Sequence, residues 1–241
     1  MAGYGQFCPI ARASEIFAER WTPLILREIM VGHHHFGEIL KGLHSISPSM
    51  LGARLHSLER VGVIETSPNP TGRGSVYHLT EAGTNLVALV KGLGVWGQQY
   101  LEIQQEHLDG DVLMWAILTH LHPEHLPPKQ RVIRFEFRDE KKRYWLVLRR
   151  GDPDLCYSDP GYGDDLAIRS DLECVTRVYL GELRLADARR AGRLEIEGPR
   201  DLARGVDTWF PISSFAPHAR PVVYDRGSES FVRVARPPLA V

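Results

Sequence analysis

The chain has 241 residues, a formal net charge of −1, 43% hydrophobic and 24% charged residues, a composition typical of a soluble globular protein with room for two hydrophobic cores. No stretch approaches the roughly 20 apolar residues of a membrane-spanning helix, and the N-terminus lacks the charged-then-apolar order of a secretory signal. The three cysteines are widely spaced, which excludes a disulfide framework and favours a reducing cytoplasm, while the near-neutral charge limits nucleic-acid binding to local groups of Arg, Lys and helix N-termini.

Apolar residues at helical spacing predict four helices in the first 62 residues. Pro9 opens the first helix, and Thr22 with Pro23 opens the second, which Gly32 ends. A short amphipathic helix over residues 36–43 follows. After a tight connection the fourth helix begins with Ser47 as N-cap and Pro48 as first residue, and it runs to Val61-Gly62. The order helix, short turn, helix predicts a helix-turn-helix.

A hairpin and a long helix follow. Residues 63–66 and 76–79 are expected to form two strands joined by the turn-rich segment 67–75, which is the pattern of a wing. A longer helix then starts at Thr80 and carries one apolar face, made by Leu86, Leu89, Val90, Leu93 and Trp96. Because such a face needs a partner, we expect a second copy of the chain to cover it, giving a homodimer.

The composition turns polar around residues 104–110, and we place a domain boundary there, giving domains 1–104 and 105–241. In the second domain, helices are expected at residues 111–121, 172–180, 185–191 and 201–209. Strands are expected at residues 132–137, 144–148, 155–157, 166–170 and 194–197. The mixture predicts the α+β class: a winged helix-turn-helix domain followed by a domain with a sheet covered by helices.

The predicted DNA contacts lie on the fourth helix and the wing. If Leu51, Leu55 and Leu58 face the core, the opposite face is small and polar and suits the major groove. Arg54 on this helix is expected to reach a guanine or a phosphate, and Arg73 lies between two glycines at the hairpin tip, where it can reach the DNA backbone or a minor groove. The full set of predicted DNA-binding residues is Ser47, Ser49, Met50, Ala53, Arg54, Ser57 and Arg73.

The first hundred residues resemble the HxlR family of bacterial winged-helix regulators over roughly residues 6–100. The motifs that carry the resemblance are Cys8-Pro9-Ile10, Trp21, Leu24 to Glu28, Phe36 to Ile39, Ile46 to Leu51, Arg54-Leu55, Leu58-Glu59 and Tyr77 to Thr80. The resemblance implies a homodimeric transcriptional regulator that binds double-stranded operator DNA, with repression the expected direction. It also implies a recognition helix at Pro48–Arg60 and a dimer interface made by the first and last helices of the module. The weakly basic recognition region departs from the family pattern.

Cys8 occupies the Cys-Pro position through which some members of that family sense oxidants or electrophiles. A thiol at a helix N-terminus has its thiolate favoured by the helix dipole, which makes thiol-based redox sensing one hypothesis. The alternative is that Cys8 is a small hydrophobic residue of the fold.

The C-terminal stretch resembles the sterol carrier protein type 2 fold over roughly residues 111–210. The resemblance rests on Asp165 to Ile168, Ser170 to Leu172, Val178 to Glu182, Ala186 to Ala188, Ala191 to Gly198 and Asp201-Leu202. It implies an apolar tunnel for lipids or acyl chains, and hence an apolar small-molecule or lipid effector. The residues expected to line the cavity are Trp115, Phe135, Phe137, Trp145, Val175, Val178 and Trp209. The alternative is that they are core residues of a dimerisation or scaffold domain.

Metal binding and catalysis find little support. His33 to His35 form a loop run, and the group His120, His122 and His125 is interrupted by Pro123, with no Cys cluster beside either. The sequence holds no P-loop, no Gly-x-Ser-x-Gly elbow and no strand-anchored dinucleotide fingerprint, so we expect no metal site, no cofactor and no enzyme. The competing hypothesis from another class is a lipid- or acyl-binding protein whose winged helix serves assembly.

Overall fold

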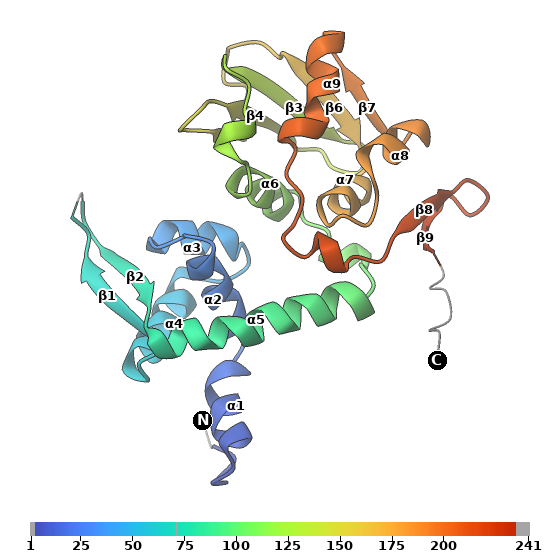
Figure 1. The fold of residues 1–241 in the computed structure, drawn as a ribbon. Helices are drawn as coiled ribbons and strands as arrows, with labels where there is room; N and C mark the ends of the chain where they lie inside the picture. The colour runs from blue at the N-terminus through green and yellow to red at the C-terminus, as the bar shows by residue number, and fades with distance from the viewer. Residues whose placement is uncertain (1–2, 71, 235–241) are drawn as a thin grey trace. The chain divides into compact units, whose positions relative to one another are not determined.

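The computed structural model describes residues 3–70 and 72–234. The chain separates into two compact units, Met1–Gly94 and Val95–Val241 (Figure 1). The sequence predicts the domain boundary after residue 104, ten residues beyond the division between these units, which falls within the long helix α5 (Glu81–Tyr100). Among the described residues, no helix combines the length and the apolar character that crossing a membrane requires.

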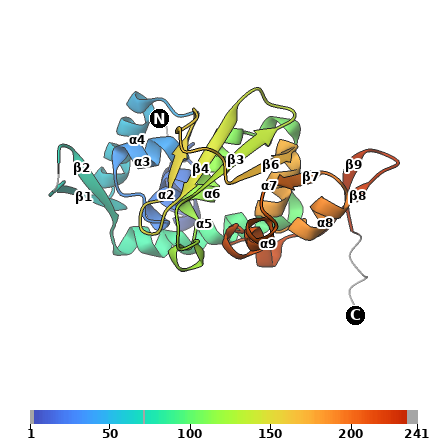
Figure 2. The same cartoon turned by 90° about the horizontal axis from the view of Figure 1, so that it is seen from above.

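The first unit is a set of helices with one hairpin. Its elements are α1 (Pro9–Phe17), α2 (Thr22–Met30), α3 (Phe36–Gly42), α4 (Pro48–Arg60), β1 (Ile64–Pro68), β2 (Ser75–Leu79) and most of α5. The predicted helices and hairpin are therefore present, with ends within a few residues of those expected. The hairpin stands out from the helices in both views (Figures 1 and 2).

One hydrophobic core holds the first unit together. Ile25, Leu26 and Ile29 of α2 pack with the Leu51, Leu55 and Leu58 stripe of α4, and Val90 of α5 joins the same cluster. Gly62 follows α4 with a φ of 72°, a left-handed conformation that glycine adopts without steric penalty. The chain can therefore turn directly from α4 into the wing.

The second unit is built on a five-stranded sheet. Its strands are β3 (Arg131–Phe137), β4 (Arg143–Leu148), β5 (Asp154–Cys156), β6 (Leu166–Ser170) and β7 (Leu194–Glu197), in the order β5-β4-β3-β6-β7. Among the strand pairs that the described residues form in this sheet, β3–β6 is the only parallel one. The helices are α6 (Gly110–Thr119), α7 (Leu172–Tyr179), α8 (Leu185–Arg190) and α9 (Arg200–Trp209), with short 3₁₀ turns η1 (Gln105–His107), η2 (Pro123–His125) and η3 (Ala216–His218). The α+β class is confirmed.

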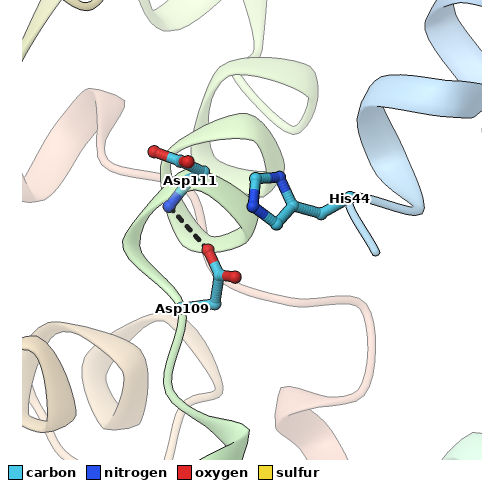
Figure 3. Close-up of side chains that lie close together, drawn as sticks. All are labelled: His44, Asp109 and Asp111. Carbon is cyan, nitrogen blue, oxygen red and sulfur yellow. Dashed lines mark hydrogen bonds between the residues drawn. The ribbon is translucent and has the colours of Figure 1, made fainter. Parts of the chain in front are cut away.

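One hydrophobic core holds the second unit together. Buried residues of the helices α6, α7 and α9 and of the sheet belong to it. Ile133, Phe135 and Phe137 of β3 lie in the cluster with Met114 of α6 and Val206 of α9. The start of α6 is fixed by Asp109, whose Oδ1 accepts hydrogen bonds from the backbone N–H of Asp111 (2.9 Å) and of Val112 (3.1 Å); Figure 3 shows the first of them. This N-cap satisfies two of the donors that a helix start leaves open.

A second hairpin, β8 (Val222–Asp225) and β9 (Ser230–Arg233), was not predicted. It is attached through a buried ion pair: Arg177 Nη1 lies 2.6 Å from Glu182 Oε2, and the two side chains are 5% and 3% exposed. The Arg177 guanidinium lies over the Phe231 ring of β9, 5.4 Å from its centroid. The backbone N–H of Val222 donates to the carbonyl of Glu182. The pair thus connects α7 and the segment after it to the hairpin.

Candidate nucleic-acid interface

The start of α4 has the geometry that its sequence predicts. Ser47 is the N-cap, and its Oγ accepts a hydrogen bond from the backbone N–H of Met50 at 3.2 Å. Pro48 occupies the first turn, where its missing N–H costs no hydrogen bond. The helix therefore begins at exposed residues, and the Ser49 backbone N–H, which has no acceptor within the helix, could meet a phosphate there.

The outward face of α4 is made by Ser49, Ala53, His56 and Arg60, all of them exposed. These positions are spaced by four, three and four residues, and lie opposite the buried stripe of Leu51, Leu55 and Leu58. Two are small, so a helix can approach base edges closely there. His56 has no hydrogen bond or ion pair within residues 3–70 and 72–234, which leaves its ring nitrogens available.

The prediction that Arg54 belongs to the outward face is wrong. Its Nη2 lies 2.7 Å from Glu19 Oε2, and the two side chains are only 20% and 22% exposed. Arg54 and Ser57 line a cleft of about 560 Å³ between α4 and the segment around α1, and Ser57 is half-buried. At 100° per residue, Arg54 lies about 60° from the buried stripe, so it flanks the core. Met50 is exposed but also lies to one side.

Sequence reasoning missed His56 and Arg60, although the signal was present. Both are three to four residues from a predicted contact, and both fall on the helix face farthest from the leucine stripe. Weighing each position by its angle to the stripe, rather than by polarity alone, separates both of them from Arg54.

The wing is held firmly at its base. The backbone N–H of Tyr77 donates to the carbonyl of His34 at 2.8 Å, and His34 Nδ1 lies 2.8 Å from the Tyr77 carbonyl. Thr66 of β1 donates a hydrogen bond to Glu59 of α4. Part of the histidine run is thus used to attach the wing. At the tip, Arg73 is exposed, as predicted, while the backbone N–H of Asn69 donates to Gly74 across the turn.

A buried carboxylate joins α2 to α3. Glu28 is buried and lies 2.7 Å from His33 Nδ1 and 2.5 Å from Arg27 Nη2, and Arg27 Nη2 also donates to the Gly42 carbonyl. Burial alone would raise the pKa of Glu28, but the hydrogen bonds from His33 and Arg27 outweigh it and hold that pKa below its ordinary value. Glu28 is therefore ionised at neutral pH, and His33 serves this cluster.

Two surfaces of the first unit and its long helix are apolar and exposed. Leu89, Leu93, Trp96 and Tyr100 are each about half exposed and form one stripe along α5. On α1, Ile10 is exposed, and none of the residues of this helix is buried. These are the two helices to which the resemblance assigns the dimer interface.

The three cysteines occupy different environments. Cys8 is the N-cap residue of α1, directly before Pro9, and is half-buried. Burial raises the pKa of Cys174 to about 11, and burial together with Asp154 raises the pKa of Cys156. The thiols of Cys156 and Cys174 therefore stay protonated at neutral pH.

The seven residues expected to line a ligand cavity do not surround a common space. Phe135, Phe137 and Val175 are buried in the hydrophobic cluster of the second unit, and Trp145 donates its indole N–H to Asp164 at 3.1 Å. Val178 and Trp209 line two different cavities, and Trp115 lines neither of these two. The aromatic side chains fill the interior, as the alternative of core residues predicts.

The first unit as a whole is a winged helix-turn-helix module: a capped helix with an exposed small-residue face beside a projecting hairpin. The model of the HxlR-like helix-turn-helix family matches residues 16–105. YodB of Bacillus subtilis, an HTH-type transcriptional regulator, is 35% identical over 97 residues, which are 39% of this chain and 87% of YodB. The chain belongs to the HxlR-like helix-turn-helix family through this N-terminal part.

Other relatives match the same part of the chain. An uncharacterized HTH-type transcriptional regulator of Mycobacterium tuberculosis is 40% identical over 93 residues, which are 38% of this chain, and the chain covers only 58% of that regulator's length. The solved structure of the reduced form of YodB is 33% identical, with a TM-score of 0.35, and the match covers 40% of this chain and 97% of YodB. These matches do not bear on the resemblance of the second unit to sterol carrier protein type 2.

Proposed function

We propose that the protein is a transcriptional regulator that binds double-stranded operator DNA through α4 and the β1–β2 wing. The observation that carries the proposal is the outward face of α4, which joins a capped helix start at Ser47 to small residues at Ser49 and Ala53. Such a face can enter a major groove, while the start of the helix meets the phosphate backbone. The family relationship supports the same function.

Within this proposal, His56 reads a base edge and Arg60 and Arg73 contact phosphates. Arg54 is a positioning residue, because its ion pair with Glu19 holds the side of α4 against the segment between α1 and α2. Removing a side chain that reads a base typically costs about 1–3 kcal/mol of specific binding. We therefore expect His56→Ala to lower specific affinity and to relax the preference at one base position.

The regulator is proposed to be a homodimer that pairs through α1 and α5. The exposed stripe of Leu89, Leu93, Trp96 and Tyr100 supports this, because large apolar side chains in one row need a cover. A two-fold dimer reads a palindrome whose half-sites lie about one helical turn apart. Replacing Leu93 and Trp96 by Glu should yield a monomer in sedimentation and abolish specific binding.

The test of DNA binding is selection of genomic fragments by the purified full chain, followed by titration of the enriched fragment at several salt concentrations. A palindromic fragment with steep salt dependence supports the proposal. His56→Ala is compared with His218→Ala, a matched loss of an exposed histidine in the second unit. Enrichment of no fragment even at low salt would favour the lipid- or acyl-binding alternative, in which the winged helix serves assembly.

The second unit is proposed to bind an apolar effector that adjusts operator occupancy, with repression as the direction. The resemblance to the sterol carrier protein type 2 fold and the fusion to a DNA-binding module support this part of the proposal. Its test is the operator affinity of the full chain with and without an effector. If a ligand is shown to bind the second unit but the operator affinity is the same with and without it, the proposed coupling between ligand binding and DNA binding is contradicted.

Thiol-based sensing through Cys8 is a second candidate function. The observation that favours it is the position of Cys8, half-buried before the first turn of α1, on a helix proposed to form the dimer interface. Oxidation there would alter α1 and hence the spacing of the two recognition helices. Cys8→Ser should bind DNA normally and lose its response to diamide. A response that survives in this variant excludes Cys8.

A further inference from the structure

The second unit contains a cavity of about 360 Å³ between the three inner strands of its sheet, β4, β3 and β6, and α9. Ile133 of β3, Leu148 of β4 and Leu166 of β6 form an apolar floor and are buried. Leu202, Gly205 and Trp209 of α9 form a wall, since residues spaced by three and four share a helix face. The volume lies in the range of small-molecule sites. The cavity is not the one that the aromatic residues of the sequence predicted.

Gly205 contributes to the opening of this space. It lies in the interior of α9, where glycine destabilises a helix by roughly 0.5–1 kcal/mol relative to alanine. A Cβ placed on Gly205 would meet no atom within 4 Å. Neither close packing nor an unusual backbone conformation therefore requires glycine at position 205. Because glycine has no side chain, space remains beside Trp209.

Charged groups of both signs lie at the rim of the cavity. Arg131 is paired with Asp165, with 2.8 Å between Nη1 and Oδ1, and Arg150 donates its Nε to the Leu126 carbonyl at 3.3 Å. The carboxylates of Glu124 and Asp201 also lie at the rim. A charged ligand of either sign gains little binding energy from a rim of mixed charge. The apolar floor also has no group that could pair with a charge.

The size of the cavity limits the ligand further. At the roughly 30 Å³ that each small group occupies in a liquid, about 360 Å³ holds about a dozen heavy atoms. We propose that this cavity binds a small, uncharged, mainly apolar molecule of about that size, which excludes an intact sterol. This inference specifies the kind of effector that the second unit is proposed to bind. It rests on the proposed function only where it concerns an effect on DNA binding.

The experiment is calorimetric titration of the full chain with 2-naphthol, an uncharged bicyclic probe of the right size. Gly205→Leu fills the cavity, and Thr208→Phe covers it from an exposed position of α9. Gly205→Ala is the matched control, because one methyl group leaves most of the space. We expect one site per chain, a loss of affinity of about tenfold or more in both blocking variants, and little change in the alanine variant.

The inference is overturned if the wild-type chain does not bind 2-naphthol at millimolar concentration, or if both blocking variants, shown to be folded by circular dichroism, bind as the wild type does. Tighter binding of 2-naphthoate than of 2-naphthol would overturn the assignment of an uncharged ligand. Operator binding is titrated in parallel. Loss of DNA binding with 2-naphthol binding retained counts against the proposed function alone, and the reverse result counts against the cavity alone.

Discussion

The buried pair of Arg177 and Glu182 allows a quantitative test of how the second unit is held together. In Arg177→Met the Glu182 carboxylate keeps its buried position and loses the cation 2.6 Å away. Breaking a buried ion pair by removing one partner costs about 3–5 kcal/mol, a large part of the 5–15 kcal/mol by which domains are usually stable. The variant should therefore unfold at a much lower urea concentration.

The loss should also depend on pH. Burial raises the pKa of Glu182, and Arg177 offsets only part of that rise. A carboxyl group whose pKa is raised in the folded state gives stability that is present below its ordinary pKa and lost as the pH rises through the raised value. Without Arg177 the pKa rises further. The deficit of Arg177→Met should therefore be larger at pH 7 than at pH 4.5.

The assay is urea unfolding followed by tryptophan fluorescence, which reports mainly the second unit because it contains Trp96, Trp115, Trp145 and Trp209. Arg184→Met is the matched control, since Arg184 pairs with Asp187 on the surface, where an ion pair contributes little. Arg177→Met with Glu182→Leu should regain most of the loss. A deficit no larger than that of Arg184→Met, or one that does not shrink in acid, would refute the reasoning.

Three further predictions concern the first unit. Gly42→Ala would push a methyl group into the carboxylate of Glu28 and should cost about 1–3 kcal/mol in thermal unfolding; an unchanged melting temperature contradicts this. Because the pKa of Glu28 is lowered, the stability that its carboxylate contributes is present above the ordinary pKa and should be lost as the pH falls through the lowered value. The melting temperature measured from pH 7 to pH 3 should therefore fall less steeply in Glu28→Gln than in the wild type. Arg73→Ala should weaken binding to all DNA sequences and lower the slope of log affinity against log salt by about 1; a loss confined to one base position would contradict the phosphate role.

Most of the fold could be predicted because its signals are local. Ser47-Pro48 specifies the start of α4 through a cap and a fixed φ, and alternating burial in β3 follows from side-chain alternation along a strand. The β8–β9 hairpin escaped prediction although its strands, of four residues each, are no shorter than β5 and β7. Its attachment depends on Arg177, about fifty residues earlier, and no local pattern reveals such a contact.

The candidate sites were predicted less well for two physical reasons. Arg54 looked available because it is charged, but an acid in the segment between α1 and α2, Glu19, pairs with it. The ligand cavity was sought among large aromatic residues, yet large side chains fill space. The cavity lies where a side chain is missing, at Gly205, and a single glycine within a helical pattern does not indicate by itself whether its face is filled.

On α4, the residues that pack in the core are different from the residues that face outward, and this allows the DNA sequence that the protein recognises to be changed. Leu51, Leu55 and Leu58 maintain the frame, whereas Ser49, Ala53, His56 and Arg60 make no contribution to that core. Exchanging these four residues for those of another regulator should redirect the module to a different operator with little loss of stability. The reading surface and the scaffold could then diverge separately, which would let copies of one gene acquire new targets while keeping one architecture.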